Sequence, residues 1–371
     1  MANDGDAGSA TSDLPLRGVT SSNSNAEPFD IVATYYRLLA EDSDLTMPMA
    51  AIEALIEFLG HNQVKTVFET IDLVKMQSTK LQLGVPNPIA LSHGTDLFQQ
   101  YLIMQLKQPN APGGAAAAKD DNINKDPDAR FEETRQSLLR NGRLFAARAK
   151  NGRERIAVNA RRYIEDGATI LTLGGSRVVG TLLGRAAEKH DFGHFIDEPI
   201  RFRVIYAMDP ALEVESNKVV AALRAKGVSV ATIPLSAVAF AMQKVDMVVV
   251  GAEAVTANGG AISRLGTLQV AQLAKAARPQ KPFYVAAEQH KFGKTLPLNQ
   301  FDFGQFVRNF DQQLLDFHAS KKEEGAEAKP RPKPLESPVD YTAPDYIDAF
   351  FSDHKVLTPI EVAKEVIDML M

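Results

Sequence analysis

The chain has 371 residues, of which 45% are hydrophobic and 23% are charged, the composition of an ordinary globular protein. Its formal net charge of -5 argues against a broad nucleic-acid surface, because such binding needs basic groups that displace counterions. The absence of cysteine excludes disulfides, thiolate catalysis, cysteine-ligated zinc and iron–sulfur clusters. The seven histidines are scattered without the spacing of metal ligands, so we expect neither a metal nor a cofactor.

Residues 1–28 are rich in serine, asparagine and aspartate and lack the cationic start and apolar core of a secretory signal. We expect them to form a disordered lead-in. No apolar run in the sequence approaches the roughly 20 residues needed to cross a bilayer. These observations predict a soluble, cytosolic protein that contacts neither membrane nor nucleic acid.

Residues 29–165 have a helical pattern and are predicted to form an N-terminal helical bundle. The stretch "MAAIEALIEFLG" places apolar residues three and four apart, after Pro48, which suits a first turn. Thr66 and Glu69 have the spacing of a capping box at the start of the next helix. Residues 107–129 are of low complexity and predict a solvated loop. A long amphipathic helix is then expected from about Ala129 to Glu165.

After Gly167 the pattern changes to short apolar runs rich in β-branched residues, separated by segments of helical length. This alternation predicts a parallel sheet covered by helices on both faces, over residues 166–371. A charged, proline-rich stretch at 319–338 predicts a flexible insert within it. Ligands of such sheets bind at the carboxyl ends of the strands.

The first candidate motif is "TILTLGGSRVVGTLL", in which a predicted strand leads through Gly174, Gly175, Ser176 and Arg177 into a predicted helix. The glycines allow close backbone approach, and the helix start offers free amides and partial positive charge to an anion. The motif is neither G-x-G-x-x-G nor a Walker loop. An ordinary strand-to-helix turn also uses Gly-Gly-Ser, and the spacing leaves both interpretations open.

The second candidate motif begins where the predicted strand "DMVVV" ends, with Gly251 and Glu253. A carboxylate in this position suits a ligand rich in hydroxyl groups, although a salt-bridged loop acid would look the same. Asn258, Gly259 and Gly260 are expected to form a turn before a helix that starts at "ISRLGT". Turn chemistry alone explains the Asn-Gly-Gly sequence.

Two further stretches follow predicted strands or precede predicted helices. Glu288, His290 and Lys291 come after the strand "PFYVAA", where His290 and Lys291 could reach a phosphate or remain solvated. The stretch "DYTAP", Asp340 to Pro344, is expected to be a turn before a helix. No arrangement of serine, histidine and aspartate can be argued from their order alone.

In order and spacing, "GATILTLGGSRVV", "DMVVVGAEAVTANGGAISRLGTLQVAQLAKA", "KPFYVAAEQHKF" and "VDYTAPDYIDAFFSDHKVLTP" resemble the family of alpha subunits of eukaryotic translation initiation factor 2B. The resemblance runs from about Phe29 to Met371. It implies an α/β fold in which an N-terminal helical bundle precedes a Rossmann-like parallel-sheet domain. It also implies a regulatory, non-catalytic subunit of the guanine-nucleotide exchange factor for initiation factor 2.

The resemblance further implies the partners of the chain. Members of the family pair with themselves through the Rossmann-like domain and join beta and delta subunits in a decamer. They help to sense the phosphorylated alpha subunit of initiation factor 2. The resemblance places Thr66 and Glu69 in the region that contacts this partner, although the pair also satisfies a capping box.

Sugar-phosphate isomerases acting on methylthioribose 1-phosphate and ribose 1,5-bisphosphate belong to the same superfamily. They carry cysteine where this chain has Gly174, aspartate where it has Glu253, and usually lysine where it has Arg264. Aldose–ketose isomerisation needs a group that moves protons between adjacent carbons, and glycine has none. The longer glutamate side chain displaces the carboxylate.

We therefore expect the pocket to bind a sugar phosphate, or a nucleoside monophosphate, without turnover. An active sugar-phosphate aldose–ketose isomerase is the alternative. The residues expected to bind the ligand are Gly174, Gly175, Ser176, Arg177, Gly251, Glu253, Asn258, Gly259, Gly260, Arg264 and Lys291.

Overall fold

The computed structural model describes residues 29–42, 45–62, 66–85, 88–107, 136, 139–144, 146–147, 149, 151–188, 202–300, 302 and 338–370. Three predicted segments lie outside these residues. They are the lead-in at 1–28, the loop at 107–129 except residue 107, and the insert at 319–338 except residue 338.

Among the described residues, five α-helices precede the first strand. The helices are α1 (Ile31–Glu41), α2 (Met47–His61), α3 (Val67–Gly84), α4 (Ile89–Lys107), α6 (Gly152–Ala160), α7 (Arg177–Ala186), α8 (Glu213–Ala225), α9 (Val238–Ala241), α10 (Thr267–Ala276) and α12 (Pro359–Leu370). The strands are β1 (Thr169–Leu173), β2 (Arg203–Met208), β3 (Ser229–Pro234), β4 (Met247–Gly251), β5 (Ala254–Val255), β6 (Ala261–Arg264), β7 (Phe283–Ala286), β8 (Val339–Thr342), β9 (Ala349–Phe351) and β10 (Val356–Leu357). Short 3-10 turns include η1 (Arg161–Tyr163), η5 (Gln289–Lys291) and η7 (Pro344–Tyr346).

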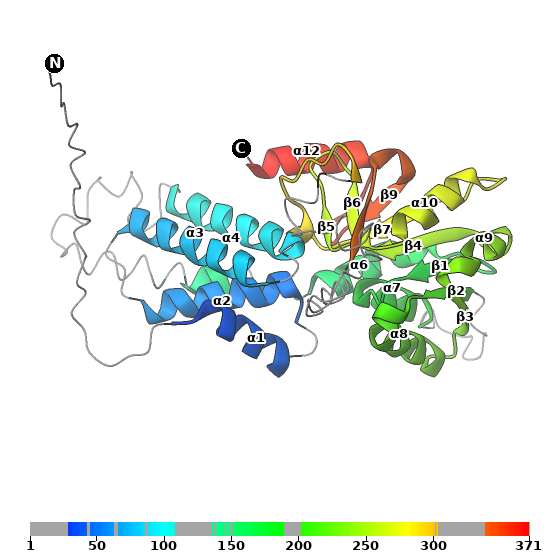
Figure 1. The fold of residues 1–371 in the computed structure, drawn as a ribbon, viewed down its shortest axis with the longest axis horizontal. Coiled ribbons are helices and arrows are strands. Elements are labelled where there is room, and N and C mark those ends of the chain that lie inside the picture. Colours follow the sequence, from blue (N-terminus) through cyan, green and yellow to red (C-terminus); the bar gives the residue numbers. More distant parts are fainter. Residues whose placement is uncertain are drawn as a thin grey trace, which may run out of the picture.

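Helices α1 to α4 form a helical lobe around one apolar core, on the left of Figure 1. Their shared buried side chains include Ile31, Ile52, Leu55 and Phe98. As predicted, a proline lies in the first turn of α2, and Thr66 is the N-cap of α3. The start of the chain is therefore a helical bundle, as the sequence indicates.

The long helix expected to end at Glu165 is shorter and interrupted. A turn at Asn151 precedes α6, which starts at Gly152 and gives way to η1 after Ala160. The Asn-Gly pair is a strong turn former, which explains the break. Gly152 also packs closely on Glu288, since a Cβ atom here would lie 3.3 Å from the Glu288 Cγ. The length prediction was wrong because the local turn outweighs the helical periodicity.

The large sheet has seven strands in the order β10-β9-β7-β4-β1-β2-β3. All neighbouring strands are parallel except β10, which runs antiparallel to β9. Helices α6, α7 and α8 pack on one face, and α9, α10 and α12 pack on the other (Figure 1). Alternate side chains of β1 serve the two faces, as for Ile170 and Leu171, which lie in different cores. The predicted parallel sheet covered on both faces is confirmed.

A second, antiparallel sheet has the order β5-β6-β8 and was not predicted. The stretch "ISRLGT", expected to start a helix, instead contributes β6, and α10 begins only at Thr267. Asp340 to Thr342 belongs to β8 and is followed by the 3-10 turn η7, so the predicted turn before a helix was wrong there too. Strand β6 pairs with β8, about 80 residues away, and this long-range pairing overrides local propensity.

Asp340 joins the small sheet to the start of α10. Its Oδ2 accepts hydrogen bonds from the backbone amides of Gly266, at 2.7 Å, and Leu268, at 3.0 Å. These bonds satisfy amides that a helix start otherwise leaves unpaired. Strand β8 therefore fixes both the strand that carries Arg264 and the helix that follows it.

Gly259 has a backbone φ of +79°, and a Cβ atom there would clash with the carbonyl group of Pro359 at the start of α12. We expect Gly259→Ala to lower the free energy of unfolding by more than about 1 kcal/mol, because the change combines backbone strain with displacement of α12. Urea unfolding of the full chain measures the effect.

Gly60 provides the matched control. It lies within α2, and a Cβ atom there meets no heavy atom within 4 Å. Gly60→Ala should raise the free energy of unfolding by about 0.5–1 kcal/mol, because alanine loses less backbone entropy in a helix. Equal effects of the two substitutions would contradict the role given to Gly259.

Candidate ligand-binding site

The two glycine-containing motifs lie at the topological switch point of the large sheet. Strand β1 pairs with β2 on one side and with β4 on the other. In an open parallel sheet, a crevice forms at the carboxyl ends of the strands where the strand order reverses, and ligands bind there. Residues 174–177 follow β1, and Gly251 ends β4. The sheet therefore brings the two motifs to the same edge.

Close backbone contacts join these motifs. A Cβ atom on Gly251 would overlap the Ser176 Oγ, and one on Gly174 would lie 3.2 Å from the Arg264 Cγ. Gly174 and Gly175 have φ values of +83° and +65°, which disfavour other residues. The glycines are thus needed where chain segments meet, besides any role with a ligand.

Ser176 is the N-cap of α7, and its Oγ accepts a hydrogen bond from the Val179 amide at 3.4 Å. The Gly175 amide donates to the Tyr206 hydroxyl at 2.8 Å. The helix N-terminus opens at this edge, as an anion cradle requires. Two of the polar groups of the cradle already have partners within the fold, and their role in anion binding remains a prediction.

Glu253 and Arg264 form an ion pair beside Gly174. The Arg264 Nε lies 2.9 Å from the Glu253 Oε1, and the two side chains are 19% and 13% exposed. Strand β6 is held against the end of β4 by a hydrogen bond from the Ser263 hydroxyl to the Gly251 carbonyl, at 3.0 Å. Within the described residues, the buried Arg264 Nη1 has no hydrogen-bond partner. The pair can therefore offer a guanidinium donor to an incoming oxygen.

The helical lobe closes over this edge. Arg177, the first residue of α7, donates from Nη1 to the Leu45 carbonyl at 3.3 Å, so its side chain reaches the segment before α2. Tyr35 of α1 is buried, and burial raises the pKa of its hydroxyl, with smaller contributions from Tyr36 and Glu253. The predicted cation Arg177 thus binds the helical lobe.

Asn258, Gly259 and Gly260 lie elsewhere. The Asn258 Nδ2 donates to the Tyr341 hydroxyl at 2.7 Å and to the Pro297 carbonyl at 3.1 Å, and a Cβ atom on Gly260 would contact the Tyr341 ring. They form the turn between β5 and β6 and pack against β8 and the start of α12. Their contacts are with Pro297, β8 and the start of α12, and their part in ligand binding stays a prediction.

Lys291 connects the crevice to a buried carboxylate. Its Nζ donates to the Ala252 carbonyl at 2.9 Å and lies 2.9 Å from the Glu288 Oε2. Burial opposes the ionisation of Glu288, but the charges of Lys291 and His290 and the hydrogen bonds to the carboxylate together outweigh it and lower the pKa of the carboxyl group to about 2. Glu288 is therefore a buried anion at neutral pH.

A cavity of about 160 Å³ lies next to this ion pair, between the helical lobe and the large sheet. The residues that line it are Asp42, Leu45, Thr46, Met49, Ala149, Arg153, Glu288 and His290. Sequence reasoning singled out Glu288 and His290 but missed Thr46 and Arg153. Thr46 precedes Pro48 at a predicted helix start, which is the only signal the sequence offered for it.

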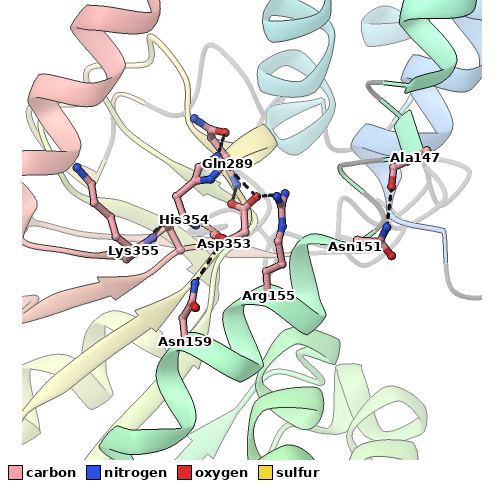
Figure 2. A network of polar contacts seen from close by, with 9 residues as sticks. Ala147, Asn151, Arg155, Asn159, Gln289, Asp353, His354 and Lys355 are labelled. Carbon is pink, nitrogen blue, oxygen red and sulfur yellow. Dashed lines mark hydrogen bonds and ion pairs between the residues drawn. The ribbon is translucent and has the colours of Figure 1, made fainter.

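A polar network holds the η5 turn, which carries His290 and Lys291 (Figure 2). The Asp353 carboxylate accepts a hydrogen bond from the backbone amide of Gln289 at 2.9 Å and one from the Arg155 Nη2 at 2.8 Å (Figure 2). Asn159 of α6 donates to the Asp353 carbonyl at 3.4 Å. The network connects α6, η5 and the segment between β9 and β10, and so fixes the floor of the cavity.

Among the residues that the structure describes, no group of three or more histidine, aspartate or glutamate side chains is arranged to hold a metal ion. Within the same residues, no helix is long and apolar enough to cross a membrane.

A model of the initiation factor 2 subunit family matches residues 40–359. The chain belongs to this family. It is 31% identical over 346 residues to translation initiation factor eIF2B subunit alpha of Dictyostelium discoideum, covering 91% of this chain and 96% of that protein. The corresponding subunit of Caenorhabditis elegans is 25% identical over 340 residues, with 91% and 98% covered.

Two further comparisons extend this relationship. Ribose 1,5-bisphosphate isomerase of Archaeoglobus fulgidus is 32% identical over 230 residues, or 62% of this chain and 66% of the enzyme. The crystal structure of eIF2B beta from Chaetomium thermophilum superposes with a TM-score of 0.66 at 17% identity, covering 91% of each chain. The second match shows a shared fold.

The buried imidazole of His290 gives the site a testable pH dependence. Burial lowers the pKa of His290 from 6.5 to about 4, against the opposing effect of the Glu288 charge. Between these values the unfolded chain binds a proton that the folded chain does not. The free energy of unfolding should therefore fall as the pH drops from 6.5 toward 4, by up to about 1.4 kcal/mol per pH unit for this group.

We expect His290→Gln to flatten this dependence, measured by urea unfolding at several pH values. Some dependence should remain, because burial also lowers the pKa of His93. An unchanged slope in the variant would show that His290 takes up its proton equally in both states.

Proposed function

We propose that this chain is the regulatory, non-catalytic alpha subunit of the cytosolic guanine-nucleotide exchange factor for translation initiation factor 2. The observation that carries the proposal is the similarity to an alpha subunit at 31% identity over 96% of its length. We propose a division into a helical domain at 29–165 and a Rossmann-like domain at 166–371. Its pocket then binds a sugar phosphate or a nucleoside monophosphate.

The absence of catalysis is supported by the chemistry of the crevice. Gly174 has no side chain to move a proton, and the Glu253 carboxylate is held by Arg264 at 2.9 Å. This ion pair engages the carboxylate that a proton transfer would use. The remaining features of the crevice, a helix N-terminus and a guanidinium donor, suit binding of a phosphate.

An apolar surface at α12 supports the assembly of the chain. We propose that the chain pairs with a second copy of itself and joins beta and delta subunits in a decamer. Ile360 and Ile367 are 83% and 52% exposed and lie seven residues apart, on the same side of the helix. Leu298, also exposed, lies in a segment that meets the start of α12 at the 258–259 turn. Exposed apolar groups gathered in this way favour a protein interface.

Sensing of the phosphorylated alpha subunit of initiation factor 2 is assigned to the exposed side of α3. Thr66 and Glu69 are exposed at its start, where the Thr66 Oγ1 accepts a hydrogen bond from the Glu69 amide at 3.1 Å. Phe68, Met76 and Leu83 of the same helix are 81%, 54% and 63% exposed. Thr66 therefore caps α3 next to an apolar surface that a partner could cover.

Native mass spectrometry of the purified chain should detect a homodimer, and pull-down should recover the beta and delta subunits. Ile367→Glu should weaken the dimer at least about tenfold, because it places a charge in an apolar interface. Val214→Glu, on the exposed side of α8, is the matched control and should leave the dimer intact. A wild-type monomer that recovers neither subunit would refute the assembly proposal.

A pull-down with the phosphorylated alpha subunit of initiation factor 2 tests the sensing surface. Phe68→Ser should reduce recovery of this phosphorylated subunit while the melting temperature and the homodimer are unchanged. Full recovery of the phosphorylated partner by this variant would remove α3 as the contact surface.

Active isomerisation is the second candidate, favoured by the similarity to ribose 1,5-bisphosphate isomerase. Incubation with ribose 1,5-bisphosphate, followed by NMR, separates the two functions. We expect the melting temperature to rise through binding to the folded state, with no ketose formed. Ketose production that Glu253→Gln abolishes would establish the enzyme and reject the non-catalytic assignment.

A further inference from the structure

The cavity beside Glu288 contains several buried polar atoms without hydrogen bonds. Glu288, His290 and Thr46 are 1%, 4% and 8% exposed. Within the described residues, the Glu288 Oε1, the His290 Nε2 and the Thr46 Oγ1 lack a hydrogen-bond partner, while the Glu288 Oε2 is paired with the Lys291 ammonium at 2.9 Å. Such groups are costly to bury unless a ligand or ordered water satisfies them. The cavity therefore has the properties of a built binding site.

These atoms favour a ligand that donates hydrogen bonds. The carboxylate oxygens only accept, whereas the threonine hydroxyl and a neutral imidazole can donate or accept. The Glu288 charge is balanced by Lys291 at 2.9 Å and Arg153 at 3.7 Å. A phosphate placed here would be repelled by the buried carboxylate of Glu288, and this repulsion opposes the attraction of Lys291 and Arg153. Hydroxyl groups satisfy the same atoms without adding charge.

His290 is neutral at pH 7 because burial lowers the pKa of its imidazole to about 4. A neutral imidazole attracts a phosphate far less than a charged one, and it can pair with a hydroxyl in either direction. The volume of about 160 Å³ corresponds to about five water molecules at about 30 Å³ each, enough for a hydroxyl-bearing fragment of similar bulk.

The cavity adjoins the crevice at two points. Leu45, which lines the cavity, accepts a hydrogen bond from Arg177 at the start of α7. Lys291 pairs with Glu288 and donates to the carbonyl of Ala252, between Gly251 and Glu253. One ligand can therefore present an anionic group to the start of α7 and an uncharged group to the cavity.

We propose that this cavity is a subsite for the hydroxyl groups of the ligand, recognised by Glu288, His290 and Thr46. The proposal rests on the proposed binding of a phosphorylated ligand at the crevice. It divides the ligand into an anionic part held at α7 and a polyol part held between the helical lobe and the η5 turn.

Isothermal titration calorimetry of the full chain with three probes tests the subsite. Ribose 5-phosphate carries hydroxyls, pentyl phosphate has a chain of the same length without them, and inorganic phosphate has neither. We expect ribose 5-phosphate to bind at least about tenfold more tightly than pentyl phosphate, because the alkyl chain leaves the buried polar atoms unpaired.

Three substitutions change the recognition atoms at similar side-chain size: His290→Phe and Thr46→Val remove them, and Glu288→Gln replaces one acceptor oxygen by a donor. Each should reduce the preference for ribose 5-phosphate over pentyl phosphate to about threefold or less. His61→Phe, which replaces an exposed imidazole at the end of α2, is the matched control and should keep the full preference. If Glu288→Gln fails to fold, the other two substitutions decide.

The outcomes separate the subsite from the function on which it rests. Equal binding of ribose 5-phosphate and pentyl phosphate by the wild type overturns the subsite, as does a full preference retained by His290→Phe and Thr46→Val. The cavity then holds only water, and phosphate binding at the crevice stands. Failure of all three probes to bind the wild type overturns both.

Discussion

The parallel pairing of β1 with β2 on one side and with β4 on the other is the constraint on which the site depends. This pairing aligns the carboxyl ends of β1 and β4, so that Gly174 and Gly251 meet at one edge. The contact leaves no space for larger side chains at these positions. Strand β6 is then held to the end of β4 and delivers Arg264 to the same edge. A register shift of one strand would separate these groups.

Backbone amides and a guanidinium supply hydrogen-bond donors at this edge of the sheet. The start of α7 and the free nitrogen of Arg264 are donors, whereas Glu253 is engaged by Arg264. The helical lobe completes the site through the hydrogen bond between Arg177 and Leu45 and through the wall that Thr46 contributes to the cavity. Residues of the helical lobe and of the segments that follow the strands of the large sheet therefore line one cavity.

Local sequence patterns predicted the elements that depend on local interactions. The strands of the large sheet follow from continuous apolar runs, the capping of α3 from the spacing of Thr66 and Glu69, and the first turn of α2 from its proline. Gly174 to Arg177 and Glu253 were placed correctly at the carboxyl ends of strands, because a parallel sheet fixes where its loops emerge.

Features that depend on distant residues could not be predicted in this way. Strand β6 was taken for a helix because its partner β8 is remote in the sequence, and that pairing also directs Asn258 toward Tyr341 and away from the crevice. Arg153 was missed because an arginine in a polar helix gives no sign of the carboxylate it will face. The break before α6 was missed because the apolar periodicity runs through the Asn-Gly pair at which the helix breaks.

The contact between Gly251 and Ser176 has a consequence for how this site can change in evolution. A side chain at position 251 would occupy the space of the Ser176 hydroxyl, so position 251 can gain bulk only if position 176 loses it. Any gain in bulk on the β4 side requires a loss at the start of α7, which removes the helix cap there. A larger residue at position 251 is therefore expected together with a smaller one at position 176, 75 residues earlier in the chain.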